Sequence, residues 1–201
     1  SNVGGGFGGK SEPFDLEFVV ARLAILSGRP VKCLYTREEV FLAHRGRHPC
    51  KMHMRMALSR DGRIQGVDAS TLLDGGAYSS FGLVTTYYSG QLLGAPYRMD
   101  SYRFHSRRVY TNKPACGPKR GHGSVQPRFA MEVQLDKAAQ ALGLDPIELR
   151  RRNYIGSETT INGFTLNPNG FLECRERVEQ ASAWKERRGH LPYGRGLGVA
   201  G

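Results

Sequence analysis

The sequence predicts an α+β fold of two layers, in which helices pack on a mixed or largely antiparallel sheet. Apolar and polar side chains alternate over residues 50–59, as in a strand with one buried face. The pair Asp61-Gly62 follows and favours a tight turn, so the chain is expected to return as a second strand to about residue 73. Apolar residues recur at helical spacing over residues 128–144, which indicates a long helix able to cover one face of the sheet.

The N-terminal part is expected to begin with a helix over residues 13–30. Pro13 suits the first turn of this helix, and Gly28 suits its C-terminal cap. A short strand is expected at residues 31–36, and a helical turn within 36–46. The apolar stripe of the first helix comprises Leu16, Val19, Val20, Leu23 and Leu26 or Ser27.

Between the hairpin and the long helix, the sequence predicts a short helix, a strand and a loop. The helical piece is expected around residues 87–93 and the strand within 97–112. Proline, glycine and cationic residues predict a long loop over 112–127. The apolar repeat of the long helix comprises Met131, Leu135, Ala138 and Leu142.

A second helix start follows at once. Asp145 is expected as N-cap, with Pro146 in the first helical position and Glu148 two residues later, close to a capping box. The three arginines 150–152 are expected to form one solvated helix end, favoured by the helix dipole.

The chain of 201 residues has room for one domain or at most two. A last helix is expected from about residue 170 to 187, with Trp184 as a packing residue. We expect residues 1–201 to form part of one domain, with about 154–201 starting a second subdomain. Both ends of the sequence look internal to a longer polypeptide.

The composition limits which ligands, metal sites and cellular compartments fit this sequence. A net charge of +11 suggests an anionic ligand, an acidic partner subunit or nucleic acid, or else a solvated basic surface. The four cysteines form no C-x-x-C pair, which argues against structural zinc and for reduced thiols in the cytoplasm. No run of 18 apolar residues and no signal peptide are visible in the sequence.

The glycine-rich stretch at residues 4–11 fits two nucleotide motifs at once. Gly4, Gly9, Lys10 and Ser11 fit the phosphate-loop pattern, whereas Gly4, Gly6 and Gly9 fit the dinucleotide fingerprint. Both motifs need a βαβ unit of a parallel sheet, but an antiparallel hairpin is expected downstream. A further alternative is a basic module that binds nucleic acid through the loop at 113–123 and the arginine clusters.

Three motifs occur in this sequence in an order that is typical of one protein family. GGGFGGK stands at residues 4–10, Arg120-Gly121-His122-Gly123 precedes Gln126, and DPIELRRRN stands at 145–153. This order resembles the molybdenum-cofactor-binding subunit of the molybdenum hydroxylases, the xanthine dehydrogenase and aldehyde oxidase family. The resemblance covers nearly the whole chain.

The resemblance implies a molybdopterin cofactor with molybdenum, often as the cytosine dinucleotide. It implies an oxidoreductase that hydroxylates an aldehyde, aromatic or heteroaromatic carbon with oxygen derived from water. Iron–sulfur clusters and FAD are implied on other subunits or domains, in an oligomeric complete enzyme without a membrane span or nucleic acid. The implied cofactor-binding residues are Gly6, Phe7, Gly8, Arg120 and Gly121, with Phe7 and Arg120 beside the metal's ligands.

The implied substrate pocket includes Ser11, His122 and Gly123. Purine-oxidising relatives carry an acidic residue where this chain has Ser11, which argues against a purine substrate. Many relatives carry Phe where this chain has His122, whose ring could stack on a flat substrate, titrate, or simply bond the backbone. The family's catalytic Glu, in a Gly-x-Gly-Glu setting, is absent from residues 1–201. We therefore expect no catalytic residue here and no turnover by this chain alone.

Overall fold

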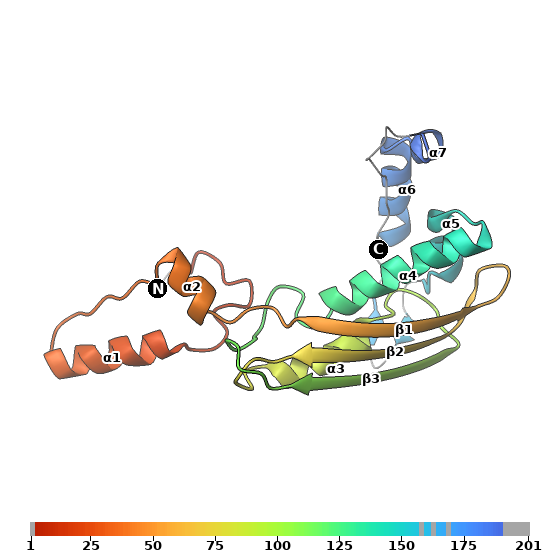
Figure 1. Ribbon diagram of the computed structural model, residues 1–201. Coiled ribbons are helices and arrows are strands. Elements are labelled where there is room, and N and C mark those ends of the chain that lie inside the picture. The colour runs from red at the N-terminus through yellow and green to blue at the C-terminus, as the bar shows by residue number, and fades with distance from the viewer. Residues whose placement is uncertain (1–2, 157–158, 162–163, 168–169, 191–201) are drawn as a thin grey trace. The chain divides into compact units, whose positions relative to one another are not determined.

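The computed structural model describes residues 3–156, 159–161, 164–167 and 170–190, which form two compact units. Unit 1 comprises 3–53, 69–93 and 104–127, and unit 2 comprises 54–68, 94–103 and the described part of 128–190. In chain order (Figure 1) the elements are α1 (Asp15–Ser27), α2 (Arg37–Ala43), β1 (Cys50–Leu58), β2 (Ile64–Asp74), α3 (Gly82–Leu92), β3 (Ser101–Val109), α4 (Val125–Leu142), α5 (Pro146–Asn153), β4 (Thr159–Ile161), β5 (Phe164–Leu166), α6 (Phe171–Ala181) and α7 (Trp184–Arg187).

The main sheet has three strands in the order β1-β2-β3, and it is mixed, as predicted. The β1-β2 hairpin closes through a turn in which the amide of Ser59 donates to the carbonyl of Arg63 at 3.0 Å. Side-chain bonds from β2 to β3 join Asp68 to Arg103 and Thr71 to Ser106, with the same sequence offset of 35. A constant offset means that β2 and β3 run parallel. Strands β4 and β5 form a separate antiparallel pair.

Side chains of β1 alternate between half-buried and exposed along its whole length, which confirms the predicted strand and its apolar face. The methionines at 52, 54 and 56 lie on the half-buried face. Their place on the half-buried face of the strand indicates that the methionines serve packing.

Helices α4 and α5 form the core of unit 2. Met131, Leu135 and Ala139 on α4 are fully buried. Ala139 takes the place that the spacing assigned to Ala138, which is only half-buried. The reason is that a 3.6-residue period lets either position face the core, and contact with neighbouring elements selects one.

The tip of the β1-β2 hairpin is held against α5 within unit 2. Gly62 has φ +89°, and a Cβ there would lie 2.8 Å from methyl carbons of Leu144 and Leu149. The Asn153 amide, itself buried, accepts from the Ile64 amide and donates to the Gly62 carbonyl, both at 2.8 Å. The Asp-Gly turn is thus needed both for its backbone angle and for close packing.

Arg150 corrects the expectation of a solvated arginine cluster. Its side chain is 2% exposed and its guanidinium lies 2.8 Å from the Glu132 carboxylate and 2.9 Å from Asp136. Tyr97 donates its hydroxyl to Glu132 at 2.9 Å. The neighbouring Arg151 stays half-exposed, as expected for the helix end. A helix presents successive residues to different surroundings, so one arginine of the run faces the core.

The C-terminal helices show one confirmed start and one unexpected break. Asp145 caps α5 by accepting from the amides of Ile147 and Glu148, at 2.7 and 3.2 Å. Its other oxygen accepts from the Trp184 indole at 2.9 Å, and Trp184 is buried as predicted. The expected single helix over 170–187 is divided at Ala183, whose φ of +48° lies outside the helical region.

In unit 1, helix α1 is confirmed, but the apolar side chains along one side of it are not buried in a core. Gly28 caps it in the left-handed conformation. Pro13 precedes the N-cap Phe14, so it stands outside the first turn. Val19 and Leu23 remain 54% and 47% exposed, because no described element packs on this face. The strand expected at 31–36 is absent from the described chain, where these residues form an extended connector without a pairing partner.

The predicted loop over 112–127 forms up to the start of α4, and α3 begins earlier than expected, at Gly82. Asp74, at the end of β2, anchors this loop by binding Lys113 Nζ at 2.7 Å and Thr111 Oγ1 at 2.6 Å.

All four cysteines are free thiols. Among the described helices, none combines the length and apolar character needed to cross a bilayer.

Candidate functional site

The glycine loop is a tight turn with unusual backbone angles. Gly9 donates its amide to the Gly6 carbonyl at 2.8 Å. Phe7 between them has φ +52°, a conformation that costs an ordinary side chain energy, and its ring is 68% exposed. The loop therefore presents an aromatic ring outward from a strained turn, which is typical of a functional site.

The loop does not have the geometry of a phosphate loop. In a phosphate loop the Lys and Ser open the following helix, whose N-terminus binds the phosphates. Here α1 begins at Asp15, after Lys10 and Ser11, and Ser11 donates its hydroxyl to the Gly8 carbonyl at 2.8 Å. Ser11 thus closes the glycine turn and contacts the loop that precedes it in the sequence.

The second predicted loop meets the first within unit 1. Arg120 donates its backbone amide to the Phe7 carbonyl at 2.8 Å, and its guanidinium lies 5.9 Å from the centre of the Phe7 ring. A Cβ on Gly8, which has φ +92°, would lie 2.8 Å from the backbone of Pro118. The two loops therefore touch backbone to backbone, and glycine is the residue that permits it.

The Arg-Gly-His-Gly segment is held by residues from several parts of unit 1. Arg47 donates to the carbonyls of Arg120 and Gly121, at 2.6 and 3.4 Å. Ser89 on α3 donates to the Gly123 carbonyl at 2.9 Å. Arg47 thus has a positioning role that local sequence does not reveal.

His122 points its ring at the start of α3. Its Nε2 lies 2.9 Å from Thr85 Oγ1 and 3.2 Å from the Phe81 carbonyl. Because a carbonyl only accepts, Nε2 carries a proton in this arrangement. Nδ1 has no partner in the described part of the chain.

His48 forms the buried base of this network. It is 2% exposed, and Arg108 Nε donates to its Nε2 at 3.2 Å. Burial, reinforced by the charge of Arg108, lowers the pKa of His48 to about 4. The ring is thus neutral, with its Nδ1 proton facing Thr85 Oγ1 at 3.5 Å.

Two carboxylates near the loops are engaged structurally. Glu12 accepts from the Ser80 hydroxyl and lies 3.5 Å from Arg45. The bonds from Lys113 and Thr111 hold the pKa of Asp74 well below its usual range. Asp74 is thus poised as a fixed charge, and its geometry does not mark it as a general base.

A model of the molybdopterin cofactor-binding domain matches residues 1–154. The chain belongs to this family. The molybdopterin-binding domain is 37% identical over 205 residues to the xanthine dehydrogenase molybdenum-binding subunit of Escherichia coli O157:H7, covering 98% of this chain and 27% of that subunit. It is 34% identical to the nicotinate dehydrogenase large molybdopterin subunit of Eubacterium barkeri, covering 90% and 43%.

Solved structures agree with this assignment of the molybdopterin-binding domain. The quinoline 2-oxidoreductase of Pseudomonas putida 86 superposes with a TM-score of 0.83 at 30% identity, over 93% of this chain and 25% of that one. The aldehyde oxidoreductase of Desulfovibrio gigas gives 0.82 at 30% identity, over 94% and 21%. The chain thus spans about a quarter of most of these relatives, and less than half of each.

The residues of the molybdopterin-binding domain fit a bulky anionic cofactor. Burial lowers the pKa of Lys119, and the charges of Arg47 and Arg45 lower it further. Positive charge is therefore concentrated beside the two loops. Gln126 donates to the His48 carbonyl at 2.8 Å, while its buried Oε1 has no partner within the described chain. A buried acceptor of this kind is normally satisfied, so it can receive a hydrogen bond from a ligand.

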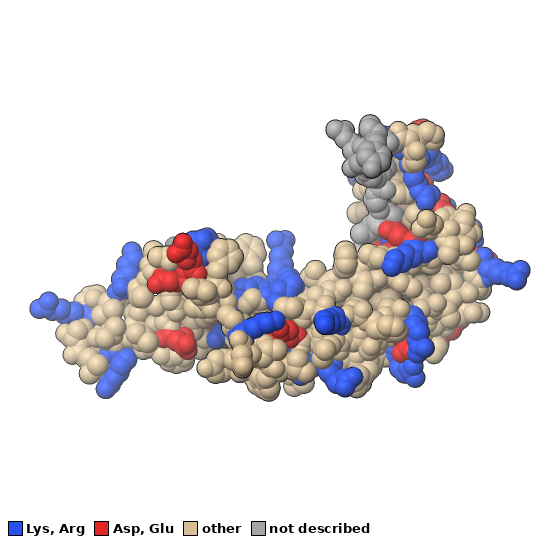
Figure 2. Space-filling model, viewed as in Figure 1, with Lys and Arg blue, Asp and Glu red and all other residues tan. Residues whose placement is uncertain are grey.

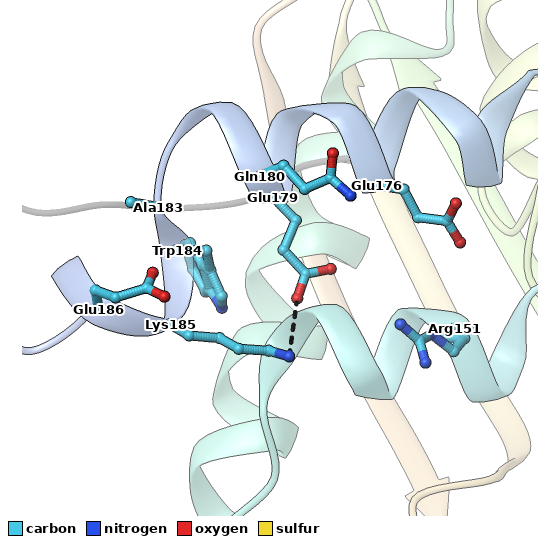
Figure 3. Close-up of a pocket in the computed structure, with 8 residues that line it drawn as sticks. All are labelled: Arg151, Glu176, Glu179, Gln180, Ala183, Trp184, Lys185 and Glu186. Carbon is cyan, nitrogen blue, oxygen red and sulfur yellow. Dashed lines mark ion pairs between the residues drawn. The ribbon is translucent and has the colours of Figure 1, made fainter.

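A different hollow lies in unit 2, with a volume of about 500 Å³. Figure 3 shows carboxylates of three glutamates around it and the pair of Lys185 with Glu179, at 3.9 Å. These carboxylates disfavour an anionic cofactor. Its lining comprises Arg151, Glu176, Glu179, Gln180, Ala183, Trp184, Lys185 and Glu186.

Proposed function

We propose that this chain forms one wall of the cofactor pocket in a molybdenum hydroxylase. Gly6, Phe7, Gly8, Arg120 and Gly121 contact the molybdopterin, and Phe7 and Arg120 lie beside the ligands of the metal. The observation that carries this proposal is the bond from the Arg120 amide to the Phe7 carbonyl, which joins the two family motifs in one unit.

The chemistry of these residues suits the role. Glycines without side chains let backbone amides approach the cofactor closely, and a fixed arginine stabilises negative charge. The bound molybdenum cofactor would supply the redox chemistry, in which a substrate carbon is hydroxylated with oxygen derived from water. This chain's own contribution is to bind the cofactor, orient the substrate and exclude water from the pocket.

Ser11, His122 and Gly123 are proposed to line the substrate side of the pocket. The relatives are named for xanthine, nicotinate, quinoline and aldehydes. Ser11 is uncharged and closes the glycine turn, which favours an aldehyde, aromatic or heteroaromatic substrate over a purine. Nδ1 of His122, which has no partner in the described part of the chain, is proposed to hydrogen-bond the substrate.

The remaining parts of the enzyme are proposed to come from outside this chain. These are the catalytic Glu, the iron–sulfur and FAD domains or subunits, and further contacts to a cofactor in its cytosine dinucleotide form. We infer that the complete oligomeric enzyme works in the cytoplasm. The chain alone is then inactive, because a general base must reach the reacting atoms.

Molybdenum analysis of the full-length polypeptide tests the proposal. Expressed in a host that synthesises the cofactor, it should hold about one molybdenum per chain. Arg120→Ala should lower that content, whereas Arg22→Ala, on the exposed surface of α1, should leave it unchanged. Folded full-length protein without molybdenum would overturn the proposal.

A further inference from the structure

The outward face of the main sheet carries its side chains in rows across the three strands. In unit 2, Asp68 on β2 binds Arg55 on β1 and Arg103 on β3, and these three residues define the register. The same register in unit 1 gives two more rows. They are Lys51, Leu72 and Arg107, and His53, Ser70 and His105.

In the row of unit 2, both arginines bind the central carboxylate. Arg103 Nε donates to one oxygen of Asp68 at 2.9 Å, and Arg55 Nε donates to the other at 3.2 Å. These bonds hold the pKa of Asp68 well below its usual range. A carboxylate on the central strand therefore satisfies a cation on each side.

The row of Lys51, Leu72 and Arg107 in unit 1 has the flanking cations without the central carboxylate. Lys51 and Arg107 are exposed and have no partner in the described part of the chain, and between them stands Leu72, 42% exposed. His53 and His105 flank Ser70 in the same way. These six side chains, with parts of three neighbours, line a hollow of about 380 Å³ that contains no carboxylate.

The spacing of the hollow suits an extended peptide. Alternate residues of a strand recur about every 6.6 Å, and the two rows have that same spacing along the sheet. Outer strands of three lie about 9–10 Å apart, which leaves room for a carboxylate between their side chains. Basic and apolar side chains share the surface, while no Phe, Tyr or Trp that could stack a nucleic-acid base lines the hollow.

We propose that this face of unit 1 binds an extended acidic segment of a partner polypeptide. One carboxylate lies over Leu72 between Lys51 and Arg107, as Asp68 lies between Arg55 and Arg103, and the next lies over Ser70 between the imidazoles of His53 and His105. Figure 2 shows Lys and Arg side chains along the face of the sheet with few Asp or Glu among them. This interaction is independent of the cofactor function proposed above.

Fluorescence anisotropy with the full-length polypeptide tests this. The probe is a labelled ten-residue peptide of alternating Thr and Glu, and Thr and Gln alternate in the control peptide. The double variant Lys51→Ala/Arg107→Ala should weaken binding about tenfold, as expected for two charge-assisted contacts. Arg22→Ala/Lys137→Ala removes the same charge from exposed surface elsewhere and should change the Kd less than twofold.

Leu72→Asp supplies the missing carboxylate from the chain itself. It should abolish peptide binding at an unchanged Tm, because Lys51 and Arg107 then have an internal partner. The proposal is overturned if neither peptide binds, if the Gln peptide binds as tightly, or if the two double variants weaken binding equally. Tighter binding of an oligo-dT ten-mer, lost in Lys51→Ala/Arg107→Ala, would assign the face to nucleic acid instead.

Discussion

Gly8 lies so close to the backbone of Pro118 that a Cβ on Gly8 would be 2.8 Å from the Pro118 carbonyl. We expect Gly8→Ala to destabilise the protein by about 1–3 kcal/mol and to lower its molybdenum content, since it forces the two loops apart. Gly46→Ala is the matched control, because a Cβ there meets nothing within 4 Å. Chemical unfolding and metal analysis of the full-length polypeptide measure both effects. Equal effects of the two substitutions would contradict the contact.

Arg150 and the adjacent Arg151 offer a comparison of one residue type in two environments. Removing the buried Arg150 leaves Glu132 without its cation, so Arg150→Ala should lower the free energy of unfolding by about 3–5 kcal/mol. Arg151→Ala, at a side chain 51% exposed, should cost less than about 1 kcal/mol. Thermal unfolding compares the two. Similar Tm values would mean that the Arg150 pair has no structural role.

The buried His48 predicts a pH dependence. Its pKa is about 4 in the folded protein against an ordinary 6.5, so the unfolded chain binds more protons between these values. Stability should therefore rise with pH from about 4 to 6.5, by up to about 3 kcal/mol from this residue, and this contribution is lost as the pH falls. His48→Gln keeps an acceptor for Arg108 and should flatten the slope, measured by urea unfolding across that range.

His105→Gln provides the control for this pH prediction, because His105 is exposed on β3. The slope between pH 4 and 6.5 should fall more in His48→Gln than in His105→Gln. An unchanged slope in His48→Gln would show that folding does not lower the pKa of His48.

Thr85 connects the two histidines, and its hydroxyl can be removed without changing side-chain size. In the full-length holoenzyme, Thr85→Val should lower kcat/KM about fivefold, mainly through KM, because His122 loses one of its two orienting contacts. Molybdenum content should not change. Thr86→Val is the control, since Thr86 bonds only the Leu83 carbonyl of its own helix. Equal kinetic losses in both variants would argue against orientation of His122.

The sequence predicted correctly those elements that are specified by a pattern of a few neighbouring residues. The alternation in 50–59 with Asp61-Gly62 fixes a hairpin, and Asp145 with Pro146 starts α5. The strand expected at 31–36 was wrong, because a strand needs a partner for its backbone groups and β-propensity alone provides none. The break at Ala183 was also missed, since helical periodicity continues through it.

The sequence by itself determined the family of this domain, the β1-β2 hairpin, the start of α5 and the two glycine-rich loops. Only the tertiary structure decided which cations and histidines are buried. Arg150 and His48 stand in polar stretches, and their burial depends on Glu132 and Arg108, which are distant in sequence. A local pattern records the period of an element, whereas the free energy of a buried charge depends on partners brought together by folding.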